Sequence, residues 1–447
     1  MIRLILADLL GHARVWTGIF AVITAAGFVA AIATGLLETG MVHGGRVRDG
    51  LASSSSAVIM FTAVTALIVL SASANLTVAL QQRTHALWQL VGIRPALVAL
   101  AVIAQLGTVA VAGGTTGALI ARSAFEPLFV WTFREWTDMQ GISLHLSVGS
   151  IAIAVVAIAA VVLLGGLRGA RRASRTPPIE ALREPEPPEA RLGWLRIVAT
   201  CLALGGTIIL IANLDGEASV SAFSGQAILL TPLIAAVLAA AGPIVFPIAL
   251  RAWTSLVPAR ASATWFLARN SARYRLSRST AAVAPLMVAI ALAGGLYTTG
   301  ATLAAAQAAR TGSADGFSLA PEGVVLLLGG PLLLSGVAAA ATVFMSGQAR
   351  EREHALVRAA GSTQGAIVLA ALWECVIYTV TAAFLGAAAT VIGGIIIAHT
   401  LALPAPTVSL AALGVIASGG FVLILAANIS PTAAALRHEI PRTLSVE

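Results

Sequence analysis

The chain has 447 residues, of which 58% are hydrophobic and only 10% are charged, and its formal net charge is +8. A soluble protein carries about a quarter charged residues, and here the apolar residues gather into runs near the ~20 residues that a helix needs to cross a bilayer. The composition therefore excludes a soluble domain and indicates an all-α polytopic membrane protein.

Ten apolar runs predict ten transmembrane helices, because the runs lack the two-residue alternation of barrel strands. The opening stretch is interrupted by Asp8, His12 and Arg14, so we interpret it as a lead-in to the first span and not as a signal peptide. In chain order, the predicted spans cover residues 15–37, 57–80, 95–121, 147–167, 195–213, 226–250, 280–299, 323–346, 365–394 and 408–427.

The placement of arginine predicts the orientation, because arginine-rich loops stay on the cytoplasmic side. With the N-terminus inside, the cytoplasmic segments hold 22 of the 27 arginines and the outer loops hold five. We expect a multi-pass protein of the bacterial plasma membrane with both termini cytoplasmic. The arginines flank spans and are not interleaved with aromatic residues, which argues against a nucleic-acid partner.

The chain contains no lysine. A Walker A phosphate loop, a Schiff base and a lysine general base are therefore excluded. The two cysteines and seven histidines show no metal-ligand or triad spacing. We expect no enzyme activity and no directly bound cofactor; ATP and Mg²⁺ would be bound by a separate chain.

The connections between spans are short. The longest outer loops, at 38–56, 122–146 and 300–322, are too small for a substantial separate domain. The aromatic stretch 125–140 predicts an interfacial amphipathic helix, with a substrate-entry lip as the alternative. On the cytoplasmic side, prolines within 168–194 end the fourth helix and predict an extended connector.

Three landmarks occur twice in the same order, which indicates an internal repeat. They are a basic amphipathic lead before a span (6–14 and 267–275), a histidine-led segment after the unit's second span (from His85 and from His354), and a P-x-x-x-A-L-R motif after its fourth (177–183 and 431–437). Two spans separate the repeated units, so both units insert in the same orientation. We predict a first four-span unit at 1–183, a linker with a central span pair at 184–263, and a second four-span unit at 264–447.

The matched segments 81–98 and 350–367, the first and second hook, each predict a short surface helix joined to a span by a tight turn. Gly92 ends the surface helix of the first hook and Pro95 opens the span. Gly361 ends the surface helix of the second hook, and a serine or threonine after it can cap the next helix. A rigid surface helix on such a turn can transmit a push, and two of them suit a two-fold partner.

These motifs resemble the FtsX-like permeases of ABC transporters. In that family, a four-span unit carries a charged R-x-x-E/H-x-A-L-L-R-A-x-G-A-T hook between its second and third spans and ends in R-x-P-x-E-A-L-R. The stretch REREHALVRAAGSTQGAI is close to that hook, QQRTHALWQLVGIRPALV is a more divergent version, and RRASRTPPIEALRE is similar to the terminus. The resemblance implies two parallel four-helix repeats of the MacB or FtsX type around a central helix pair.

The resemblance also implies a cytoplasmic ABC ATPase dimer as the partner, with each hook seated as a coupling helix in one ATPase groove. Many family members carry a sizeable extracytoplasmic domain; neither unit has one here, which argues against docking to an outer-membrane tunnel and against lipoprotein handover. Carried over by position, the coupling residues would be Arg83, His85, Leu87, Trp88 and Gly92 in the first hook, and Arg352, Glu353, His354, Leu356, Arg358 and Gly361 in the second.

A candidate intramembrane polar site consists of Glu374, in the ninth span, and Gln105, its repeat counterpart. An ionised group at the bilayer centre is costly, so Glu374 should face protein or water. We expect a polar clamp between helices or, alternatively, a contact for a substrate or a proton. The GGTTG stretch at 113–117 predicts close helix packing and not a phosphate cradle.

These features together predict the permease subunit of an ABC transporter, which couples ATP hydrolysis by a separate ATPase to the export or extraction of a hydrophobic or amphiphilic substrate from the lipid membrane. The alternative is a mechanotransmitter that signals to a sensor kinase or an extracytoplasmic enzyme without transport, although the short outer loops offer such a partner little surface. A secondary transporter is disfavoured by the parallel repeats. Because one chain carries two hooks, we expect one copy per two ATPase subunits.

Overall fold

A computed structural model describes residues 11–175, 194–214, 220–258, 262–274, 276–311, 321–345 and 356–436. Across these ranges the chain forms helices and no strand. Ten of the helices are long and apolar enough to cross a membrane, which confirms the predicted all-α polytopic class. A helix is the expected element because it satisfies its own backbone hydrogen bonds inside lipid.

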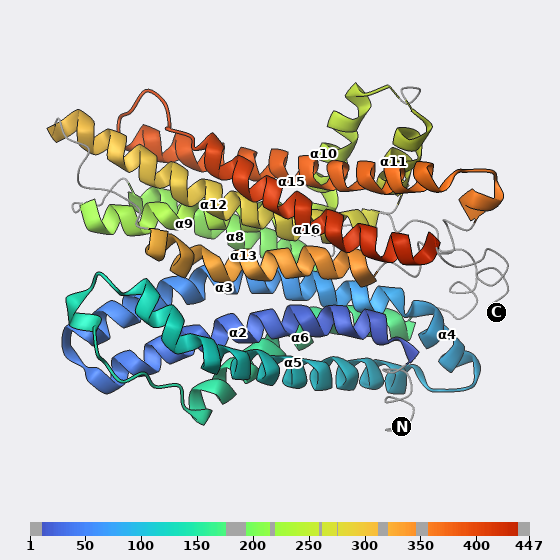
Figure 1. Cartoon of the computed structure of the whole chain (residues 1–447), viewed down its shortest axis with the longest axis horizontal. Coiled ribbons are helices and arrows are strands. Elements are labelled where there is room, and N and C mark those ends of the chain that lie inside the picture. Colours follow the sequence, from blue (N-terminus) through green and yellow to red (C-terminus); the bar gives the residue numbers. More distant parts are fainter. Residues whose placement is uncertain are drawn as a thin grey trace. The chain divides into compact units, whose positions relative to one another are not determined.

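The chain divides into two compact units, shown in Figure 1. The first comprises Met1–Glu186 with Pro321–Ser346, and the second comprises Pro187–Ala320 with Gly347–Glu447. The helices of the first unit are α2 (Ala13–His43), α3 (Gly45–Leu80), α4 (Gln82–Leu90), α5 (Pro95–Thr132), the 3₁₀ turn η1 (Thr137–Met139), α6 (Val148–Arg175) and α13 (Pro321–Met345). Those of the second are α8 (Trp194–Leu214), α9 (Val220–Ala240), α10 (Gly242–Leu256), α11 (Ala263–Tyr274), α12 (Leu276–Thr311), α15 (Gln364–Thr400) and α16 (Leu410–Leu436).

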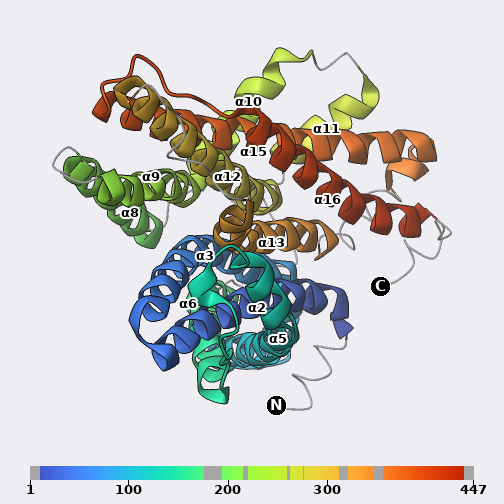
Figure 2. The same cartoon turned by 60° about the vertical axis from the view of Figure 1, so that its left-hand side comes forward.

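In the first unit, α2 packs against α3, α5, α6 and α13, and its apolar face is almost completely buried. Figure 2 shows α2 running among α3, α5 and α6. Ile19, Val22 and Ile23 on α2 are 0–1% exposed. Within a bilayer the hydrophobic effect does not drive such burial, because lipid tails are as apolar as these side chains; van der Waals packing between the helices holds α2 in place.

In the second unit, α12 is the central helix. Nearly every residue from Ala281 to Leu296 on α12 is buried, and α12 packs against α9, α15 and α16. A helix that is apolar all round fits such a position, because each of its faces meets another helix. The central pair α8 and α9 pack against each other, and α9 also contacts α15.

Two segments of the first unit, 38–56 and 125–140, differ from the sequence prediction. The segment 38–56, expected as a loop, is helical except at Gly44, which takes a φ of +69°. The aromatic stretch 125–140 is not a separate interfacial helix: α5 continues through Thr132 and η1 follows. The reason is a buried cluster at this end of the unit, formed by Leu36, Leu51, Phe125, Phe129, Phe133 and Met139.

One helix crosses the predicted unit boundary. The helix α13 lies in the second four-span unit of the sequence, 264–447, but packs on α2 and α3 within the first compact unit. The compact units therefore differ from the predicted ones: α13 belongs to the first compact unit, and the predicted central pair α8 and α9 belongs to the second. Most of the predicted connector (176–193), which contains the first P-x-x-x-A-L-R motif at 177–183, and the last residue of the second motif, Arg437, lie outside the described residues.

Candidate coupling site

The first hook begins one residue after α3 ends, where Gln81 separates α3 from the nine-residue helix α4. The inner face of α4 is closed: His85 and Ala86 are 1% and 3% exposed, and the His85 ring lies 5.4 Å from that of Trp88 in an edge-on contact. The outer face is open, because Leu87 is 46% exposed. The surface helix therefore presents a leucine outward while histidine and alanine hold it to its own unit.

The turn after α4 is a Schellman motif. The N–H of Gly92 donates to the carbonyl of Gln89 (3.0 Å), and the N–H of Ile93 donates to the carbonyl of Trp88 (3.0 Å). This 5→2 and 6→1 pair closes the helix around a left-handed residue, and Gly92 has a φ of +95°. Arg94 is extended and Pro95 opens α5. The sequence prediction of a glycine turn into the third span is confirmed.

The second hook repeats this turn. The N–H of Gly361 donates to the carbonyl of Arg358 (2.9 Å), and the N–H of Ser362 donates to the carbonyl of Val357 (3.2 Å). Gly361 also has a φ of +95°. Thr363 is extended, and its side chain accepts a hydrogen bond from the N–H of Ala366, which caps α15 as the sequence predicted.

The predicted coupling residues differ in how they are presented. Arg83, Leu87 and Leu356 are exposed, Trp88 and Arg358 are half-buried, and His85 lies on the closed face of α4. The structure thus makes His85 a packing residue of the hook and leaves the two leucines as its outward apolar groups. Three predicted residues of the second hook lie outside the described residues: Arg352, Glu353 and His354.

The turn geometry predicts a specific sensitivity to a methyl group. Nothing lies within 4 Å of a Cβ built at Gly361, so replacing it with alanine meets no neighbour but forces an L side chain into the left-handed region. We expect Gly361→Ala to destabilise the turn by about 1–2 kcal/mol. The measurement is the midpoint of thermal unfolding of the purified chain in detergent.

Gly365→Ala is the matched control, because Gly365 lies four residues away in the first turn of α15 and a Cβ added there also meets no atom within 4 Å. Alanine is favoured over glycine in a helix by up to about 1 kcal/mol, so this change should be neutral or slightly stabilising. Equal effects of the two changes would contradict a conformational role for Gly361.

The candidate intramembrane polar residues are both buried. Gln105 on α5 is 0% exposed and Glu374 on α15 is 8% exposed. Close to Glu374, Asn428 of α16 forms a polar contact with α15: its amide donates to the carbonyl of Ala371 and to Cys375 Sγ (both 3.1 Å). Sequence reasoning missed Asn428, since an asparagine near the end of an apolar run has no distinguishing pattern.

The glycines at 113–117 provide close helix packing, as predicted. A Cβ at Gly113 would lie 2.9 Å from Ile23 Cγ2, and one at Gly117 would overlap the carbonyl oxygen of Thr24, both on α2. From the other side, a Cβ at Gly27 would lie 2.7 Å from the carbonyl oxygen of Gly114. Small residues let the two backbones approach in lipid, where van der Waals packing drives helix association.

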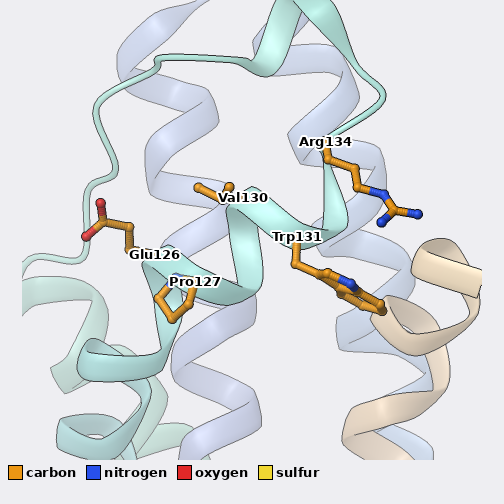
Figure 3. A pocket seen from close by; sticks show the side chains of 5 residues that line it. All are labelled: Glu126, Pro127, Val130, Trp131 and Arg134. Carbon is orange, nitrogen blue, oxygen red and sulfur yellow. The ribbon is translucent and has the colours of Figure 1, made fainter.

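The other end of α5 carries an open pocket of about 600 Å³ (Figure 3), lined by Glu126, Pro127, Val130, Trp131 and Arg134. The Glu126 and Arg134 side chains point away from each other across it.

Arg134 pairs with Glu322, which lies in the first turn of α13 and is 8% exposed. This ion pair joins the end of α5 to the start of α13. The Glu322 carboxylate is also stabilised by the positive end of the α13 helix dipole. The 188-residue separation of the two partners hid the pair from sequence reasoning.

Within the described ranges, no three His, Cys, Asp or Glu side chains are grouped as a metal ion would require. No protein-family model matches the chain, and no curated protein matches its sequence. The candidate site therefore rests on its own geometry: two surface helices, each carrying an outward leucine and each joined to a long helix by the same turn.

Proposed function

We propose that the chain is the permease subunit of an ABC transporter and that both hooks are coupling helices for a separate cytoplasmic ATPase dimer. The observation that carries the proposal is the repeated turn, in which Gly92 and Gly361 share a φ of +95° and the same pair of backbone hydrogen bonds. The two backbone hydrogen bonds of a Schellman turn hold the surface helix at a fixed angle to the spanning helix that follows. A displacement of the surface helix therefore moves the spanning helix as well. Coupling needs such a connection, and a plain loop does not supply it.

The packing of the spanning helices supports two parallel FtsX-like repeats. In the first unit, α2 contacts α5, α5 contacts α6 and α2 contacts α6; in the second, α12 contacts α15, α15 contacts α16 and α12 contacts α16. A close-packing glycine recurs at the same spacing as the hooks: Gly117 and Gly386 are 269 residues apart, as are Gly92 and Gly361. A Cβ at Gly386 would lie 2.8 Å from Ile290 Cγ2 on α12, the counterpart of α2.

The transported substrate would be hydrophobic or amphiphilic and would be exported or extracted from the bilayer. The partner supplies ATP and Mg²⁺ binding, because the chain has no lysine for a Walker A loop. The location would be a bacterial plasma membrane, and the arginine distribution supports an orientation with the hooks and both termini cytoplasmic.

The test is the stoichiometry of the complex with a candidate partner ABC ATPase. A two-fold ATPase dimer presents two equivalent grooves and one chain carries two hooks, so we expect one copy of this chain per two ATPase subunits. Native mass spectrometry of the detergent-solubilised complex measures the ratio, and the chain alone should hydrolyse no ATP above background. A two-to-two complex, or no complex at all, would overturn the proposed use of the hooks.

A further inference from the structure

A stripe of N–H donors runs along one side of α11. Trp265, Arg269 and Arg273 follow one another at intervals of four residues, which places their side chains on the same face of the helix. Trp265 is 3% exposed, and its indole Nε1 has no hydrogen-bond partner; Arg269 Nε is likewise buried without one. Buried donors in proteins are nearly always paired, so two unpaired donors one turn apart indicate an acceptor that the described part of the chain does not provide.

The end of this stripe is fixed to α10. Arg273 donates from Nε and Nη2 to Thr254 Oγ1 (3.1 and 2.8 Å), and from Nη2 to the carbonyl of Arg251 (3.1 Å). Burial lowers the pKa of the Arg273 guanidinium, and the positive charges of Arg269 and Arg251 lower it further. Three guanidinium groups are thus held near one another, and none of the three forms an ion pair with a carboxylate of the described chain.

Three tryptophan rings pack together beside the donors. Trp265 lies between Trp253 of α10 and Trp373 of α15, with ring centroids 6.1 and 5.4 Å apart. Trp253 Nε1 donates to Thr381 on α15 (2.9 Å), which fixes that ring. Tryptophan favours the level of lipid headgroups, where the apolar ring and the polar N–H find different surroundings.

The position of α11 in the chain places this cluster at a membrane boundary. Within the second unit, α10 and α11 pack beside α15, and the α12 span begins at Ser279, only five residues after α11 ends. Figure 2 shows the α10–α11 hairpin at one side of α15. Phe266 and Tyr274 on α11 are 49% and 61% exposed, which leaves apolar rings available to the hydrocarbon next to the arginines.

We propose that Trp265, Arg269 and Arg251 bind the phosphate of an anionic phospholipid headgroup at the α10–α11 hairpin. The phosphate oxygens accept from the indole N–H and the guanidinium groups, and the acyl chains lie along the exposed rings of α11. An anion is required because three positively charged guanidinium groups lie close together without a counter-charge. A lipid is favoured over a soluble anion because the donors pack against three tryptophan rings beside a membrane span. The proposal is independent of coupling to an ATPase.

The test uses the full chain purified in detergent and exchanged with dioleoylphosphatidylglycerol or dioleoylphosphatidylcholine, with bound lipid counted by native mass spectrometry. We expect tighter retention of phosphatidylglycerol. The double variant Arg251→Gln/Arg269→Gln, which keeps the Arg273 link between α10 and α11, should weaken that retention by about tenfold or more, because charge-assisted hydrogen bonds are lost. Trp265→Phe removes the Nε1 donor, keeps most of the ring, and should cause a smaller loss in the same direction.

Arg171→Gln is the control, because Arg171 is exposed on α6 in the other unit and its replacement removes the same kind of charge. Sodium phosphate at matched ionic strength should not displace the lipid; displacement by phosphate and not by chloride would assign the site to a free anion and overturn the lipid assignment. Equal retention of the two lipids, or equal behaviour of Arg171→Gln and the double variant, would also overturn it. If the double variant loses its monodisperse elution profile, the comparison of Trp265→Phe with the unaltered chain decides.

Discussion

Gly117→Ala is expected to cause a larger loss of stability than alanine at Gly107 or Gly386, because its Cβ would overlap the backbone of α2. The new Cβ would meet the carbonyl oxygen of Thr24 and lie 2.7 Å from the nitrogen of Phe28. A backbone cannot rotate away as a side chain can, so α2 and α5 must separate along their contact. Overpacking of this kind costs about 1–3 kcal/mol or more, which corresponds to a fall on the order of 5 °C in the thermal midpoint.

Gly386 and Gly107 serve as comparisons for the stability loss expected at Gly117. At Gly386 an added Cβ would lie 2.8 Å from Ile290 Cγ2 and 3.1 Å from the carbonyl oxygen of Met287, a smaller overlap with backbone than at Gly117, so Gly386→Ala should cost less than Gly117→Ala. At Gly107, on the same helix as Gly117, the nearest atom is Leu163 Cδ2 at 3.8 Å, an ordinary contact, and Gly107→Ala should be neutral or stabilising. The order of the midpoints, measured by size-exclusion chromatography after heating, checks the argument; a Gly117→Ala midpoint no lower than that of Gly107→Ala would contradict it.

The sequence predicted these local features because each has a local cause. Ten apolar runs predict ten spans, GGTTG predicts close packing, and a glycine followed by proline or threonine predicts the turn of each hook. The partners of these features depend on the whole fold. The ion pair of Arg134 with Glu322 and the polar contact of Asn428 with Ala371 join helices far apart in sequence, and periodicity within one helix carries no information on them.

Two errors in the predicted elements share a physical reason. The segments 38–56 and 125–140 look like loops and interfacial helices because glycine, serine, arginine and tryptophan interrupt their apolar patterns. Phe125 and Phe129, one turn apart on α5, are instead buried with Leu36 and Leu51. Tertiary contacts extend these helices beyond the length that hydropathy alone predicts.

Leu356→Asp is expected to weaken binding of the partner ATPase sharply. Leu356 is 56% exposed on the surface helix that leads into Gly361, and in the proposed complex it is an apolar group buried in an ATPase groove. An aspartate there would place an unpaired charge in the interface, and loss of one central contact typically costs about 2–4 kcal/mol, or roughly 30- to 1,000-fold in affinity. Pull-down of the ATPase and stimulated ATP hydrolysis measure the loss, with membrane insertion unchanged. Leu256→Asp is the control, because Leu256 is 82% exposed and lies outside the hooks.

The two hooks should act together on one ATPase dimer, and the Leu87→Asp/Leu356→Asp double variant tests this. If each hook meets one groove of the same dimer, binding at the second groove is intramolecular, so either single variant keeps one contact and loses the gain in effective concentration. The double variant has lost the predicted leucine contact of both hooks and should retain no more ATPase than membranes without the chain. A double variant that binds as well as either single variant would show that the two hooks do not share a partner. Full binding by all three would show that the exposed leucines are not coupling contacts, and the repeated glycine turn would then require another explanation.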